Sequence, residues 1–225
     1  MKKLIFVGFF ILYTVILSAQ SFHKGALVVD GSAAIEIYNT KFYQKYNPTG
    51  KDTLVEDRAG NRSFSLGVEY GIIDRLGAGI RYSNSKYFAE ADDSTKMQPN
   101  IQSNNIMAMI NCHLINRKVL GLHTGINIGY SGFAGITNNI NKDVIYGKGF
   151  YFDWHLTPSV WIGNFGFHWD ISIPFVSYGK VTTNNSTFDK DYTNKLKFLG
   201  YGIGTGIQYR FLSKKKKDEG DKSID

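Results

Sequence analysis

The stretch RSFSLGVEYGI, residues 62–72, alternates without a break between bulky apolar residues and small or polar ones. Because successive side chains of a β-strand point to opposite sides, this period of two predicts a strand with one apolar face. After residues 73–75 the alternation resumes over residues 76–83, so a short turn would join the two segments into a hairpin. The apolar face of the first segment consists of Phe64, Leu66, Val68, Tyr70 and Ile72.

Further alternating segments come in pairs that short gaps separate. They cover residues 105–114 and 120–130, then 150–162 and 165–175. A last segment alternates apolar residues with glycines from 199 to 211, and a weaker first one runs from about 26 to 38. Each interior glycine would cost a helix about 1 kcal/mol, which favours a strand for the last segment. The sequence therefore predicts an all-β protein with eight strands.

Short and long connections between these segments alternate. Turns of two to four residues are expected at 73–75, 115–118 and 163–164. Roughly twenty-residue segments rich in Asn, Thr, Ser, Lys and Asp read as solvated loops. They lie at 39–61, 84–101, 131–149 and 177–196. This layout predicts an antiparallel up-and-down transmembrane β-barrel with short periplasmic turns and long extracellular loops.

The N-terminus carries the signature of export. Lys2 and Lys3 precede an apolar run over residues 4–17, and Ser18-Ala19-Gln20 follows. The run is shorter than the about 20 residues of a membrane helix, which favours a cleaved signal peptide over an anchor. The expected organisation is a signal peptide at 1–19, the barrel at 20–212 and a charged periplasmic tail at 213–225.

Composition agrees with a β-rich chain and excludes other classes. Aromatic residues make up 15% of the chain, and 24 glycines stand against 4 prolines. Cys112 is the single cysteine, so no internal disulfide can form. The formal charge of +7 is spread along the sequence, and the basic run at 214–217 is followed by acidic residues. Nucleic acid is therefore not an expected partner.

The volume of a barrel decides which face looks inward. An eight-stranded barrel has an interior only just wide enough for side chains, so it cannot hold the many aromatic residues of the apolar face. That face is expected to meet lipid, with aromatic girdles near both ends. The candidates are Tyr82, Tyr130 and Phe150 at the loop side and Tyr70, Phe165, Tyr209 and Phe211 at the turn side.

The inward face carries the remaining chemistry, a set of charged residues and histidines. Because buried charges must be paired, we expect a lumen-filling network in which Glu69 contacts Arg81 across the first hairpin. Its expected members are Glu36, Glu69, Arg81, His123, Asp153, His155, His168, Asp170 and Arg210, with His113 on the same face.

The third hairpin offers a sharper alternative. If Gly163 and Asn164 form a two-residue turn, Ser159 lies opposite His168, and Thr157 lies opposite Asp170, which is the inventory of an activated nucleophile. A deep lumen site without an oxyanion hole or a substrate route argues against a hydrolase. No metal site or cofactor is expected either, since the histidines lack the usual ligand spacing.

Two prolines interrupt the alternating segments of this hairpin. Pro158 and Pro174 each remove a hydrogen-bond donor in a sheet that has no free edge. We therefore expect a β-bulge at each of them.

These features resemble the small eight-stranded outer-membrane barrels of the OmpA and OmpX type and the related porin-like barrel domain. The resemblance implies residence in the outer membrane and assembly by the barrel-assembly machinery, which in such families recognises a final aromatic such as Phe211. The expected function is a non-enzymatic surface barrel with a mostly plugged lumen, in contact with outer-membrane lipid and offering its loops to a surface ligand. A narrow channel for small or apolar solutes is the alternative, because the alternate glycines of the last strand leave room inside. An outer-membrane hydrolase ranks third.

Overall fold

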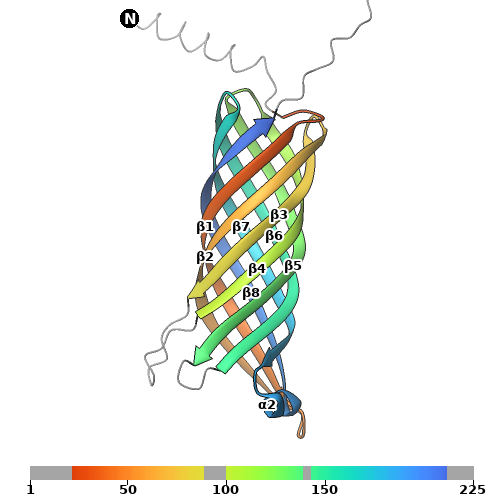
Figure 1. The fold of residues 1–225 in the computed structure, drawn as a ribbon, viewed down its shortest axis with the longest axis vertical. Helices are drawn as coiled ribbons and strands as arrows, with labels where there is room; N and C mark the ends of the chain where they lie inside the picture. Colours follow the sequence, from red (N-terminus) through yellow and green to blue (C-terminus); the bar gives the residue numbers. More distant parts are fainter. Residues whose placement is uncertain (1–21, 89–99, 139–142, 212–225) are drawn as a thin grey trace, which may run out of the picture.

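The computed structural model describes residues 22–88, 100–138 and 143–211, in which eight antiparallel strands close into a barrel in chain order (Figure 1). The predicted signal peptide and charged tail lie outside these residues. No helix of the described part of the chain is long and apolar enough to cross a membrane. The elements are β1 (Leu27–Tyr46), β2 (Lys51–Ile73), β3 (Leu76–Phe88), β4 (Asn100–Asn116), β5 (Leu120–Asn138), β6 (Asp143–Ile162), β7 (Phe165–Thr183), the short helix α2 (Ser186–Asp191) and β8 (Tyr192–Phe211).

The predicted all-β, eight-stranded antiparallel barrel is confirmed, and the alternation sorts side chains as expected. On β8, Ile203 is 69% exposed on the outer wall, whereas Gln208 and Arg210 of the opposite phase are buried inside. Cys112 also lies on the outer wall as a free thiol. Because the strands carry one apolar and one small or polar face, closing the sheet buries the polar face and leaves an apolar outer belt.

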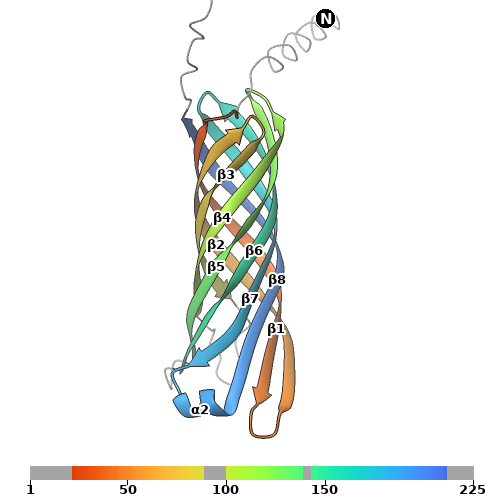
Figure 2. The same cartoon turned by 90° about the vertical axis from the view of Figure 1, so that its right-hand side faces the viewer.

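The two ends of the barrel differ. The turn end holds the connections at 74–75, 117–119 and 163–164 together with both termini of the described chain, and the loop end holds residues 47–50 and α2 (Figures 1 and 2). At the turn end, Gly163 has a φ of 63°, a left-handed conformation that glycine adopts without strain, so the predicted two-residue turn forms.

Three of the four predicted twenty-residue loops, at 39–61, 131–149 and 177–196, are wrong, because most of their described residues continue the strands. Most of the fourth, at 84–101, lies outside the described residues. β1 and β2 remain paired as far as Tyr46 and Lys51, and β7 and β8 extend to Thr183 and Tyr192. The resulting β1–β2 hairpin stands beside α2 at the loop end (Figure 2). On β1 and β2 no residue from 39 to 58 is buried, so these parts lose the alternation that identified the strands while their backbone pairing persists. On β5 and β7 the inward face stays buried but carries apolar rings such as Phe133 and Tyr178, which removes the contrast between the two faces.

The expected bulges at Pro158 and Pro174 are absent. The pairing of β6 with β7 keeps one register from Leu156↔Ile171 to Ser159↔His168, and Pro174 lies opposite Asp153 in that same register. Each proline interrupts a ladder locally without inserting a residue, since it only removes one donor. The bulge between β6 and β7 instead lies at Lys148 and Gly149.

Candidate functional site

The lumen is the candidate site, and its middle holds most of the polar residues that the sequence singled out. The predicted network lines the inner wall, but its pairing differs from the expectation. Arg81 Nη2 lies 2.8 Å from Asp30 Oδ2, and His113 Nε2 donates a hydrogen bond of 2.9 Å to Glu69 Oε1. The predicted contact between Glu69 and Arg81 is therefore wrong.

Glycine on the intervening strand explains the Arg81 pairing. Asp30, Gly67 and Arg81 lie side by side on β1, β2 and β3. A Cβ on Gly67 would overlap the Asp30 carboxylate, so the missing side chain lets Asp30 reach across β2. Glu69 of β2, by contrast, is paired with Gly79 of β3, which is two residues away from Arg81.

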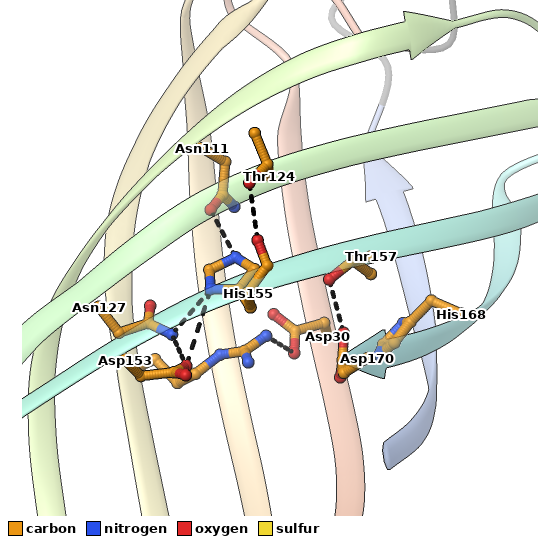
Figure 3. A network of polar contacts seen from close by, with 10 residues as sticks. Asp30, Asn111, Thr124, Asn127, Asp153, His155, Thr157, His168 and Asp170 are labelled. Atoms are coloured by element: carbon orange, nitrogen blue, oxygen red, sulfur yellow. Dashed lines mark hydrogen bonds and ion pairs between the residues drawn. The ribbon is translucent and has the colours of Figure 1, made fainter. Parts of the chain in front are cut away.

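A second polar row has the same arrangement. Asn111, Gly125 and His155 lie side by side on β4, β5 and β6, and His155 Nε2 donates a hydrogen bond of 3.0 Å to Asn111 Oδ1 above the glycine (Figure 3). The Asn127 amide donates to Asp153 Oδ2 at 2.9 Å and to His155 Nδ1 at 3.3 Å. Both ring nitrogens of His155 therefore have partners, which holds the imidazole ring in one orientation.

The third hairpin has the register that the sequence predicts. Its serine, histidine and aspartate, however, are not joined into a catalytic triad. Thr157 Oγ1 donates to Asp170 Oδ1 at 2.7 Å, and His168 Nε2 lies 3.4 Å from Asp170 Oδ2. Ser159 is paired in register with His168, yet both ring nitrogens of His168 lack a hydrogen-bond partner among the described residues. Serine and histidine are neighbours here, but no hydrogen bond activates the serine.

The turn end of the lumen is closed by a segment that precedes β1. Phe22 is buried there and stacks on the ring of His113 with 3.7 Å between centroids. The Asn116 side chain forms two hydrogen bonds with the backbone of Phe22. Its Oδ1 accepts from the Phe22 N–H at 2.6 Å, and its Nδ2 donates to the Phe22 carbonyl at 2.5 Å. Beside it, the guanidinium of Arg210 lies 4.4 Å from the ring of Trp161. Aromatic packing and a cation–π contact thus fill this mouth.

A buried aromatic cluster fills the lumen toward the loop end, and the sequence reasoning missed it. Tyr38 and Glu36 are linked by a hydrogen bond of 2.6 Å from the phenol to the carboxylate, which joins the cluster to the polar layer. The available signal was phase: each aromatic continues the inward positions of its strand, as Tyr38 does after Glu36. The cluster comprises Tyr38, Ala59, Tyr87, Met107, Phe133, Tyr151, Val176, Tyr178, Val181 and Phe198.

Little open space remains between these layers. The cavity bordered by Glu36, Arg81 and Asp170 has a volume of about 30 Å³, and the one beside Phe22 and Trp161 about 10 Å³. A water molecule needs roughly 10–15 Å³ of such space, so each holds at most a few waters. Within the described residues, no group of three or more His, Cys, Asp or Glu side chains could hold a metal ion.

The predicted girdle aromatics all lie on the outer wall. Tyr82, Tyr130 and Phe150 occupy one row across β3 to β6, with Ile106 between the two tyrosines. At the turn end, the ring of Tyr209 is 4.9 Å from that of Phe165 and 4.7 Å from that of Phe211. Tyr70 is also exposed near this end, at 54%.

Comparison with known proteins identifies the fold. No known family and no curated protein matches the sequence. The outer membrane protein OprG of Pseudomonas aeruginosa superposes with a TM-score of 0.60 at 12% identity, over 87% of this chain and 100% of that one. The outer membrane protein AlkL superposes with a TM-score of 0.51 at 10% identity, over 88% and 96%. The chain thus has the fold of the small outer-membrane β-barrels.

Proposed function

We propose that this protein is an integral outer-membrane barrel with a closed lumen, which acts through its outer wall and its loop-end rim. The observation that carries the proposal is the closure of the lumen at three successive levels. They are the Phe22 plug, the polar layer around Arg81, and the aromatic cluster around Tyr38.

Membrane residence is supported by the height of the apolar outer wall. On β8 the outward side chains are apolar or weakly polar from Leu199 to Phe211, about 40 Å along the strand. A tilt of roughly 40° reduces this to a height of about 30 Å, close to the thickness of a hydrocarbon core. The wall exposes large apolar side chains that only lipid can accommodate.

The glycines of β8 do not leave the lumen open. A Cβ on Gly202 would overlap the Ser172 hydroxyl and the Glu36 side chain, and one on Gly206 would overlap the ring of His168. Neighbouring side chains therefore occupy the space that the glycines vacate. This arrangement favours a closed barrel over the alternative, a narrow channel for small or apolar solutes.

We also propose that the protein is not an enzyme. Ser159 lies in the narrow part of the lumen beside Gly121 and His168, within the closed layers. An acyl-transfer site needs an activated serine, an oxyanion hole and a path for substrate. We expect Ser159→Ala to leave any hydrolase activity of the purified protein unchanged, and a loss of measurable esterase turnover would reinstate the hydrolase.

Biogenesis and contacts follow from the same proposal. Residues 1–19 would direct export and be removed, and the barrel-assembly machinery would recognise the end of β8 near Phe211. Outer-membrane lipid would surround the wall, and a ligand at the cell surface would meet the loop-end rim.

Single-channel recording of the refolded protein in planar bilayers tests the closed lumen. We expect no current steps, with a porin of known conductance as the positive control. Reproducible steps would favour the channel alternative. Envelope fractionation with a gel shift between boiled and unboiled samples tests the location separately, because recovery in the soluble fraction contradicts it.

A further inference from the structure

The outer wall changes character abruptly at the loop end of the apolar belt. On β2 the outward position after Phe64 is Arg62, and on β6 the one after Phe150 is Lys148. On β8 it is Lys197 after Leu199. A band of basic side chains therefore lies immediately beyond the apolar belt, at the level of lipid headgroups.

The basic side chains of this band include three pairs that face each other directly across neighbouring strands. We call them the opposed pairs. They are Lys41↔Lys197 on β1 and β8, Arg62↔Lys86 on β2 and β3, and Lys148↔Lys180 on β6 and β7.

Like charges directly opposite each other destabilise a sheet. Only Lys41 has an acidic partner, with its Nζ 2.6 Å from Glu56 Oε1, and no other member forms an ion pair within the described residues. Arg62 stacks over the ring of Phe88 and Lys197 over that of Tyr43, contacts that orient the cations without neutralising them. Three pairs of facing cations beyond the apolar belt, only one of which includes an ion-paired lysine, are best explained by an anion that is bound between the partners.

Among the described residues, the strands at the turn end carry no facing cations. The outward strand residues there are apolar, such as Ile162 and Phe165. Its turns carry Asp74, Arg75, Arg117 and Lys118, and none of these faces another cation across neighbouring strands. The asymmetry therefore points to a partner in one leaflet only.

We propose that the opposed pairs bind phosphate groups of phosphorylated glycolipids in the outer leaflet of the membrane. The inference rests on the proposed membrane function. A phosphate monoester on a sugar carries about −1.5 to −2 charges at pH 7, which matches two facing cations, whereas a phospholipid diester carries only one. With pairs on β1/β8, β2/β3 and β6/β7, several lipids would be held around the circumference.

The test compares the protein with two triple variants of equal charge change. Lys86→Gln/Lys148→Gln/Lys197→Gln removes one member of each opposed pair, and Arg75→Gln/Arg117→Gln/Lys118→Gln removes three cations at the turn end. Each protein is refolded into vesicles of phosphatidylcholine alone, or of phosphatidylcholine with added lipid A or dephosphorylated lipid A. A fourth vesicle contains enough phosphatidylglycerol to match the negative charge of the lipid A vesicle. The readouts are the unfolding temperature from the heat-dependent gel shift and the dissociation constant for fluorescent lipid A.

We expect lipid A to raise the unfolding temperature of the wild type and of the turn-end variant, and to affect the opposed-pair variant little. Its dissociation constant should rise about fivefold for each lysine removed. In phosphatidylcholine alone the opposed-pair variant should be at least as stable as the wild type, because repulsion is relieved.

Three outcomes would overturn the inference alone: equal stabilisation of both variants by lipid A, equal stabilisation by the dephosphorylated lipid, or an equal effect of phosphatidylglycerol. Failure of the wild type to insert into any vesicle would instead contradict the membrane function itself.

Discussion

Replacing Arg81 by methionine is the most informative perturbation of the lumen. Its guanidinium pairs with Asp30 at 2.8 Å, with side-chain exposures of 13% and 9%, and borders the same small cavity as Glu36, Asp153 and Asp170. Removing one partner of a buried ion pair leaves the other charge uncompensated and typically costs about 3–5 kcal/mol. We expect Arg81→Met to lower the free energy of unfolding by that amount, measured by urea titration of the vesicle-inserted barrel.

The double variant Arg81→Met/Asp30→Asn provides the matched control. It removes both charges at once, so we expect the loss to shrink to below about 2 kcal/mol, which gives a clear coupling energy. Arg75→Met, in the exposed turn between β2 and β3, should change the free energy of unfolding by less than about 0.5 kcal/mol. If Arg81→Met lowers the free energy of unfolding by less than about 1 kcal/mol, the ion pair with Asp30 does not stabilise the polar layer as inferred.

Three further predictions concern the two faces of the wall. Gly125→Ala should cost about 1–3 kcal/mol of unfolding free energy because its Cβ overlaps the Asn111 and His155 side chains, while Gly132→Ala, whose Cβ meets its nearest neighbour at 3.6 Å, should cost less than about 1 kcal/mol; equal costs would contradict the row arrangement. Phe22→Ala should cost about 3 kcal/mol but yield no current steps in bilayers, since two closed layers remain; a conducting variant would show that the plug alone seals the barrel. A fluorophore on Cys112 should be quenched by lipids brominated on their acyl chains and not by aqueous iodide; the reverse would place this wall in water.

Strand phase was readable from the chain because it depends on neighbours in sequence alone. Alternation placed Ile203 outside and Gln208 inside, and the Gly163-Asn164 turn fixed the register that pairs Ser159 with His168. The same reasoning failed where strands leave lipid. No residue between 39 and 58 is buried, so no alternation marks the long β1–β2 hairpin.

Pairing partners inside the lumen could not be read in the same way. Glu69 and Arg81 are near each other in sequence, but the side chains that meet are Asp30 with Arg81 and Glu69 with His113. Each contact passes over an intervening strand at a position where a glycine has no side chain, as Asp30 does over Gly67 of β2. It therefore depends on the order and stagger of three strands.

The amino-acid sequence by itself determined the period-two wall of residues 62–72 and its repetitions, because face selection in a strand is a local property. The tertiary structure alone decided which inward charges neutralise each other, that aromatic rings close both ends of the lumen, and that basic residues face each other beyond the apolar belt. Those relations join residues as distant as Lys41 and Lys197, which become neighbours only when β8 closes on β1. Barrel closure brings them together, and no local pattern encodes it.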